Sequence, residues 1–197
     1  MNDLYLFGAG GHSKVIIEIA ELLNINISGL IDNHSKLDHL FNYPVFSEIP
    51  EEILSIIIAV GNNKIRKEIV EANLNFRYKS LIHPESIISS RSKIGEGSVI
   101  MGGVTINSEV EIGKHCIINT NASIDHECKI SDYVHISPNA ALAGNVEIQE
   151  GTQIGIGACV IQDIKIGKWC TIGAGAVIIE DIPDNVTVVG NPGKIIK

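Results

Sequence analysis

The second half of the chain repeats an aliphatic residue at every sixth position. The series runs without a break from Ile94 to Ile178, and Ile82 and Ile88 extend it backward. Four residues after each aliphatic comes a mostly small residue, for example Ser98, Ala122 or Cys128. An internal repeat of this kind predicts a solenoid, in which each repeat packs only on its neighbours.

A six-residue repeat predicts one short strand and one tight turn, and three of them complete a triangular coil. The aliphatic then points inward and stacks on its equivalent 18 residues away. Each buried isoleucine contributes roughly 1.5–3 kcal/mol of transfer free energy, so the ladder dominates the stability of this half. We expect glycine or asparagine to supply the positive φ that sharp corners need. Glycine recurs one residue after the aliphatic, at Gly95, Gly113, Gly155, Gly167 and Gly173.

The first half has a different pattern, in which short apolar runs alternate with helical periodicity. Strands are predicted at 4–7, 27–31 and 56–60, and helices at 13–23 and 64–73. A strand, a crossover helix and a second strand form a βαβ unit, so we expect a small parallel α/β domain of Rossmann type. The expected division is therefore residues 1–80 for the α/β domain and 81–197 for the repeat domain, closed by a cap at 188–194.

Composition narrows the class of protein. The formal charge is −8, which argues against a nucleic-acid surface, because neutralising phosphates requires clustered Lys and Arg. The first seven residues carry no basic group, and no apolar run approaches the roughly 20 residues that span a bilayer. We expect a cytoplasmic protein with no membrane partner. Three of the four cysteines, Cys116, Cys128 and Cys170, fall in the small inward position and predict core packing, with no metal site.

A glycine-rich segment, Gly8-Ala9-Gly10-Gly11-His12-Ser13, follows the first strand and opens the first helix. Such a loop lets backbone amides approach a phosphate at the positive end of a helix, although it can also be a simple turn. Asp32 ends the second strand, and Gly61 and Asn62 follow the third. Small or polar residues thus end all three strands at one edge of the sheet, which predicts a nucleotide site there.

The repeat domain contains candidate catalytic histidines. His126 is followed directly by Glu127, and a histidine beside a carboxylate can act as a general base. A histidine on an exposed face can also be solvated or lie at a subunit contact. His115 and His135 are 20 residues apart and are expected on one side of the prism, with His126 on another. If His126 and His135 serve one site, adjacent subunits would supply them.

Together these residues resemble the hexapeptide-repeat acyltransferases, and among them the NeuD/PglD-like sugar acetyltransferases of bacteria. The resemblance covers nearly the whole chain. It rests on the glycine-rich segment, on residues 58–66 (IAVGNNKIR), on residues 119–128 (NTNASIDHEC), on 143–146 (AGNV) and on 189–192 (VGNP). It implies a left-handed parallel β-helix, a homotrimer with active sites between subunits, acetyl-CoA as co-substrate, and a nucleotide sugar held by the N-terminal domain.

The resemblance also implies roles for individual residues. His126 is similar to the general base, Glu127 to the group that orients it, and Asn119 to a polar contact near the reacting groups. His135 would bond the thioester region, and the coenzyme A groove would be lined by Gly144, Ile156, Gly173 and Gly175. The nucleotide-sugar pocket would contain Gly10, Gly11, His12, Asp32, Gly61 and Asn62. Asn33 stands where members often have a second acidic residue, which leaves the nucleotide preference open.

The expected reaction is transfer of acetyl from acetyl-CoA to the amine of a nucleotide-linked sugar, such as a UDP-4-amino-4,6-dideoxy sugar. The nearest alternative is an O-acetyltransferase acting on sialic acid or its CMP form. A zinc hydrolyase of the γ-carbonic anhydrase type would need His115, His126 and His135 as ligands, and their spacing of 11 and 9 residues does not suit that family. A non-catalytic sugar-nucleotide binder is the remaining alternative.

Overall fold

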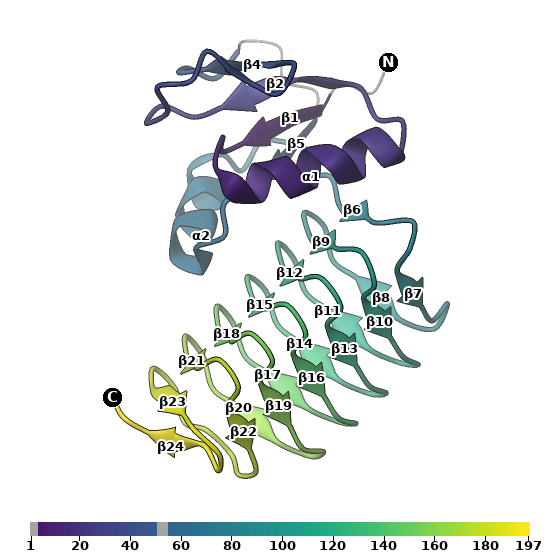
Figure 1. The fold of residues 1–197 in the computed structure, drawn as a ribbon, viewed down its shortest axis with the longest axis vertical. Coiled ribbons are helices and arrows are strands. Elements are labelled where there is room, and N and C mark those ends of the chain that lie inside the picture. Colours follow the sequence, from purple (N-terminus) through teal and green to yellow (C-terminus); the bar gives the residue numbers. More distant parts are fainter. Residues whose placement is uncertain (1–3, 51–54) are drawn as a thin grey trace.

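The computed structural model describes residues 4–50 and 55–197. It has two parts: an α/β layer and a three-sided β-helix that extends away from it (Figure 1). The N-terminal start of the chain and residues 51–54 lie outside the described residues. None of the helices in the described part is both long and apolar enough to traverse a bilayer.

The α/β layer is a five-stranded sheet with the order β3-β4-β2-β1-β5. Its strands are parallel except for the edge strand β3. The predicted strands and helices are present, with shifts at their ends, and the β3–β4 hairpin was not predicted. The elements are β1 (Leu4–Phe7), α1 (Gly11–Leu22), β2 (Ile27–Ile31), β3 (His39–Leu40), β4 (Tyr43–Phe46), β5 (Ser55–Ile58) and α2 (Asn63–Ala72).

The order of these strands reverses the direction of winding at β1. From β1 the chain crosses through α1 to β2 on one side, whereas β5 pairs with the other side of β1. Ligands of such sheets bind outside the carboxyl ends of the strands where the direction of winding reverses. The loops after β1 and β5 meet there, because the buried Ser13 hydroxyl donates to the Gly8 carbonyl at 2.8 Å and lies 3.4 Å from that of Ala59.

The β-helix has three sheets, parallel except for the last strand β24, and equivalent strands as far as β22 are 18 residues apart, as in the pairing of Ile106 with Ile124. The sheet toward the α/β layer, called here the domain-facing sheet, contains β6 (Leu81–Ile82), β9 (Val99–Ile100), β12 (Ile117–Ile118), β15 (His135–Ile136), β18 (Gln153–Ile154), β21 (Thr171–Ile172), β23 (Thr187–Val189) and β24 (Lys194–Ile195). The uncharged sheet contains β7 (Ile87–Ile88), β10 (Thr105–Ile106), β13 (Ser123–Ile124), β16 (Ala141–Leu142), β19 (Cys159–Val160) and β22 (Val177–Ile178). The charged sheet contains β8 (Lys93–Ile94), β11 (Glu111–Ile112), β14 (Lys129–Ile130), β17 (Glu147–Ile148) and β20 (Lys165–Ile166).

The ladder predicted from the sequence forms the core of this part. From Ile100 to Ile178 every ladder residue is buried, together with the small residues and the three cysteines expected there. Ile82 departs from the pattern at 37% exposed, because it lies in the first coil and has no coil before it. The fold is therefore the left-handed parallel β-helix that the six-residue period and the resemblance implied, with β24 folding back on β23 as its cap.

The expectation that glycine or asparagine supplies the positive φ at the corners was confirmed in part. Positive φ occurs three residues after the ladder position, where the side chains include Glu109, Asn121, Asn145 and Trp169 as well as glycine. The glycines one residue after the ladder are needed for a different reason, which is the close approach of the next coil. A Cβ on Gly95 would lie 2.4 Å from the backbone of Gly113.

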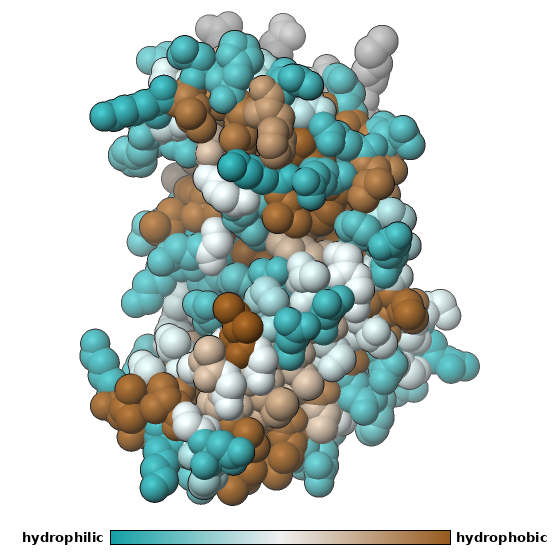
Figure 2. Space-filling model, viewed as in Figure 1, coloured by the Kyte–Doolittle hydropathy of each residue, from teal (hydrophilic) through white to brown (hydrophobic). Residues whose placement is uncertain are grey.

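The two parts share a continuous apolar core. Leu81, Val99, Met101 and Ile117 of the domain-facing sheet pack in one cluster with residues of β1 and α1. Figure 1 shows α1 lying between the α/β sheet and the first coils. In the same view apolar side chains gather near α1 and at the C-terminal end of the β-helix (Figure 2), where Ile195 and Ile196 are exposed.

Candidate active site

His126 and Glu127 form a hydrogen-bonded pair in the turn between β13 and β14. Their atoms Nδ1 and Oε2 are 2.9 Å apart, and both side chains are more than half exposed. The hydrogen bond to Glu127 raises the pKa of His126. Because Nδ1 is engaged by the carboxylate, Nε2 is the nitrogen left to accept a proton from a substrate.

The backbone of this pair is held by the preceding residue. Asp125 accepts a hydrogen bond from the His126 amide at 2.8 Å, and the same oxygen accepts one from the Asn107 side chain at 2.8 Å. Glu127 itself has φ of 62°. His115 and Tyr133 occupy corners of the same kind, so this conformation belongs to the architecture and is not a sign of a special site.

A second polar pair lies on the domain-facing sheet. The Asn119 amide nitrogen is 3.1 Å from Nε2 of His135 in β15. Burial, reinforced by the positive charge of Arg66 and by His12, lowers the pKa of His135 to about 3. Its Nδ1 is buried without a hydrogen-bond partner among the described residues. The backbone of Gly61 raises the pKa of His135, but by less than burial lowers it.

His12 from the glycine-rich segment belongs to the same region. Burial lowers its pKa to about 4, with a further contribution from the Arg66 charge, and its Nε2 also has no partner in the described part of the chain. The Arg66 charge lowers the pKa of both His12 and His135, so the two imidazoles share the electrostatic environment of this guanidinium. The structure therefore brings a predicted substrate residue and a predicted donor residue to one junction between the two parts.

Arg66 of α2 is the residue of this junction that the sequence did not single out. It is 1% exposed, and it donates to the carbonyls of Val60 at 3.0 Å, Gly61 at 3.2 Å, His115 at 2.8 Å and Tyr133 at 2.9 Å. It also bonds the Asn63 side chain at 2.7 Å. The available signal was its spacing with Asn63 and Val70, which form the buried face of α2.

The predicted nucleotide loop leaves space at the start of α1. Gly10 caps α1 without a side-chain hydrogen bond, and a Cβ on Gly10 or Gly11 would meet nothing within 4 Å. The first amides of α1 are thus open to a ligand. Asp32 shapes the edge of this loop, since its carboxylate accepts from the amides of Ala9, His34 and Ser35 at 2.9, 3.0 and 3.1 Å. Asn62 caps α2 by accepting from the Ile65 amide at 3.1 Å.

The residues expected to line the coenzyme A groove fall into two groups. Ile156, which is 58% exposed, lies with Gly173 and Gly175 on the corner between the domain-facing and uncharged sheets. Gly144 lies instead beside His126, on the corner between the uncharged and charged sheets. Within one chain, these two groups are on opposite edges of the uncharged sheet.

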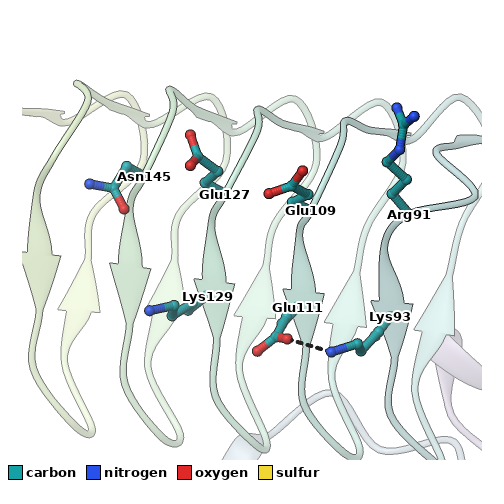
Figure 3. A pocket seen from close by; sticks show the side chains of 7 residues that line it. All are labelled: Arg91, Lys93, Glu109, Glu111, Glu127, Lys129 and Asn145. Atoms are coloured by element: carbon teal, nitrogen blue, oxygen red, sulfur yellow. Dashed lines mark hydrogen bonds and ion pairs between the residues drawn. The ribbon is translucent and has the colours of Figure 1, made fainter.

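A polar groove of about 400 Å³ runs along the charged sheet and touches the site only through Glu127. Figure 3 shows two rows of side chains across successive coils, one with Arg91, Glu109, Glu127 and Asn145 and the other with Lys93, Glu111 and Lys129. Lysine and glutamate alternate along the second row and continue through Glu147 and Lys165, with ion pairs of 2.8 Å at Lys93–Glu111 and 3.6 Å at Lys165–Glu147. The lining of the groove thus carries both signs of charge, and within it Lys93 and Glu111 form an ion pair.

The three histidines considered as zinc ligands, His115, His126 and His135, do not lie together. His115 is stacked on Tyr133 with ring centroids 5.4 Å apart, at the corner entering the domain-facing sheet, while His126 and His135 lie elsewhere. In the described ranges, no group of three or more His, Cys, Asp or Glu side chains could hold a metal ion.

Comparison with known proteins agrees with this architecture. Residues 3–72 match the PglD N-terminal domain, and residues 91–126 and 145–180 match the bacterial transferase hexapeptide family. A UDP-N-acetylbacillosamine N-acetyltransferase of Bacillus subtilis is 41% identical over 113 residues, which cover 51% of this chain and 52% of that protein. This chain thus matches about half the length of that curated relative.

Two solved structures match over nearly their whole length. The acetyltransferase domain of PglB from Neisseria gonorrhoeae has a TM-score of 0.93 and 39% identity, covering 100% of both chains. A histidine-to-alanine variant of GDP-perosamine N-acetyltransferase from Caulobacter crescentus, in complex with CoA and GDP-perosamine, has a TM-score of 0.95 and 31% identity, covering 100% of this chain and 98% of that one. The chain therefore belongs to the PglD-like sugar acetyltransferases of the hexapeptide-repeat acyltransferase superfamily.

Proposed function

We propose that this protein transfers the acetyl group of acetyl-CoA to the amino group of a nucleotide-linked amino sugar. The observation that carries the proposal is the exposed His126–Glu127 pair, in which Nδ1 is fixed and Nε2 is free. The names of the relatives support the substrate class, because both the Bacillus protein and the Caulobacter protein are N-acetyltransferases of amino sugars. A UDP-4-amino-4,6-dideoxy sugar is the acceptor we favour.

In this reaction an amine is the nucleophile, and it must lose a proton at or before attack. Nε2 of His126 takes that proton while the amine nitrogen forms a bond to the thioester carbonyl carbon. The carbon–sulfur bond then breaks, the acetyl group remains on nitrogen, and the proton passes to the departing coenzyme A sulfur. Glu127 stabilises the imidazolium that exists between these steps, since its carboxylate accepts a hydrogen bond from Nδ1–H.

The nucleotide of the acceptor is proposed to bind outside the carboxyl ends of β1 and β5. Gly10 and Gly11 offer open amides to the phosphates, and Asp32, Gly61 and Asn62 form the surrounding loops. His12, Asn119 and His135 would then face the sugar and the thioester from the junction of the two parts. Both imidazoles stay neutral near pH 7 because their pKa values are lowered to about 4 and about 3.

A homotrimer is part of the proposal, and the character of the three sheets supports it. The outward residues of the uncharged sheet are Ile87, Thr105, Ser123, Ala141, Cys159 and Val177, and interface cores are depleted of charge. One edge of this sheet carries Asn119 and the other carries His126. If three copies turn this sheet toward a threefold axis, the His126 edge of one copy meets the Asn119 edge of its neighbour.

The proposed function is tested with thiol release from acetyl-CoA, using UDP- and GDP-linked 4-amino-4,6-dideoxy sugars beside sialic acid and CMP-sialic acid. We expect turnover with an amino sugar nucleotide and a fall in kcat of roughly 10²–10⁴-fold for His126→Ala. If sialic acid is the only acceptor that supports turnover, the acceptor group is a hydroxyl and the proposed amine acceptor is wrong. No thiol release with any acceptor would reject catalysis.

The shared site is tested by mixing two inactive variants. His126→Ala and His135→Ala subunits are unfolded and refolded together, and each keeps the histidine that the other lacks. Roughly a quarter of the interfaces in a random mixture then have both histidines, so activity should return to about that fraction. Mixing that restores nothing, although both variants assemble, would reject a site divided between subunits.

A further inference from the structure

Gly144 occupies a position that does not require glycine for the fold. It is the second residue after the ladder in its coil, and the same position in neighbouring coils is Ser108, His126 and Gln162. Gly144 is also absent from the residues with positive φ. An ordinary side chain would therefore suit the backbone at 144.

What excludes a side chain at this position is the imidazole of His126 from the coil before. A Cβ on residue 144 would lie 2.5 Å from Cε1, 2.6 Å from Nε2 and 3.2 Å from Nδ1 of that ring. Non-bonded carbon atoms prefer separations of about 3.5–4.0 Å, so the overlap is too large to absorb by a small shift. The ring occupies the space that a side chain at 144 would need.

The backbone under the ring cannot easily move away. The Asn145 amide donates to the His126 carbonyl at 2.9 Å, and the Asp163 amide donates to the Gly144 carbonyl at 3.1 Å. The Asn145 side chain also bonds Asp163 at 2.8 Å. Residue 144 is thus held between two coils, and the exposed imidazole is the group that must yield to a Cβ.

We propose that Gly144 is a positioning residue for the general base: its missing side chain lets the His126 ring lie against the next coil while Nδ1 stays bonded to Glu127. Two contacts then fix the ring, Gly144 against its Cε1–Nε2 edge and Glu127 at Nδ1. They determine the direction in which Nε2 meets the acceptor amine. This inference rests on the proposed role of His126.

The direct test is Gly144→Ala. A displaced ring loses its bond to Glu127 and misplaces Nε2, so kcat should fall roughly 10–100-fold. Loss of the carboxylate partner lowers the pKa of the base, and the base is active only when deprotonated. The acid limb of the kcat profile should therefore move to lower pH, while the Kd of CoA and the melting temperature change little. Gln162→Ala, at the same position one coil further on, is the matched control and should leave all four quantities unchanged.

A double-mutant cycle separates this role from a direct contact with coenzyme A. Once His126 is replaced by alanine the ring is gone, so adding Gly144→Ala should cause no further loss of the residual activity. An equal loss in both backgrounds, or a Kd for CoA raised in step with the loss, would overturn the inference and assign Gly144 to the donor groove.

The outcomes also distinguish this inference from the proposed function. An inactive His126→Ala beside a fully active Gly144→Ala would overturn the inference alone. Full turnover by His126→Ala would overturn the base and the inference together. A titration of the His126 ring nitrogens by NMR gives a readout independent of activity, and an unchanged pKa in Gly144→Ala would contradict displacement of the ring.

Discussion

Arg66 in α2 donates from Nε to the main-chain carbonyl of His115 at 2.8 Å, so a guanidinium of the α/β part is bonded to the backbone of the β-helix. The remaining donors of the same group reach Val60, Gly61 and Tyr133. One buried side chain thus connects the loop after β5 with two successive coils. Burial lowers its pKa to about 10, which still leaves it charged at neutral pH.

Replacing Arg66 with methionine should destabilise the junction. Several carbonyls would lose their buried donor, and each unsatisfied buried acceptor costs about 1–3 kcal/mol. We expect the free energy of unfolding to fall by at least about 3 kcal/mol in urea denaturation, with Arg66→Lys intermediate because one ammonium cannot reproduce the planar set of donors. Arg77→Met, at an exposed arginine, is the control; equal stability of the two methionine variants would reject this role of Arg66.

Three histidines with lowered pKa values predict loss of stability in acid. Burial lowers the pKa of His12 and His115 to about 4 and that of His135 to about 3, against a normal value near 6.5. Below pH 6.5 the unfolded chain takes up protons that the folded chain does not. The free energy of unfolding should therefore fall as the pH drops from 6.5 toward 4, by up to about 1.4 kcal/mol per pH unit for each imidazole that stays neutral in the folded chain.

Urea titrations between pH 7.5 and 4.5 measure this slope. Comparing the wild type with His135→Asn separates the contribution of this histidine to the slope from the contribution of the carboxylates. The variant should have a shallower slope than the wild type below pH 6.5 and the same slope above it. Parallel curves over the whole range would mean that His135 is protonated equally in the folded and unfolded chains.

Glu127→Gln should move the pH dependence of turnover. The bond from Nδ1 to the carboxylate raises the pKa of His126, and an amide oxygen is a weaker partner for the imidazolium. Because the base acts when neutral, the acid limb of kcat should shift to lower pH, and kcat at its plateau should fall. A kcat profile recorded from pH 5 to 9 gives both values. A shift to higher pH would show that Glu127 does not support the charged ring.

The glycines between coils make a prediction about stability alone. A Cβ on Gly155 would lie 2.5 Å from the Ile172 carbonyl oxygen, so Gly155→Ala should force the coils apart and cost about 1–3 kcal/mol. Gly157→Asn is the matched control, because its φ of 64° is one that asparagine already adopts at other corners and nothing lies within 4 Å of its Cβ. Thermal unfolding of both variants tests the assignment, which fails if the asparagine variant is the less stable.

The six-residue repeat allowed most of the fold to be predicted. An aliphatic at each sixth residue leaves little choice of coil, and Ile106, Ile124 and Leu142 stack as the period requires. The hairpin of β3 and β4 escaped prediction because its strands are short and Tyr43–Phe46 is only half buried, so alternation is weak. The sequence shows the glycines in the repeat but not the structural reason for them, because a close approach of another coil and a positive φ both favour glycine.

The sequence by itself determined the β-helix, the βαβ order of the first part and the adjacency of His126 and Glu127, because each depends on spacing along the chain. Only the tertiary structure decided that Arg66 is buried against two coils, that His12 and His135 share the influence of its charge, and that the His126 ring lies over Gly144. Those relationships join residues from different elements or different coils. Their distances depend on how helix α2 and successive coils pack, and no local periodicity encodes that packing.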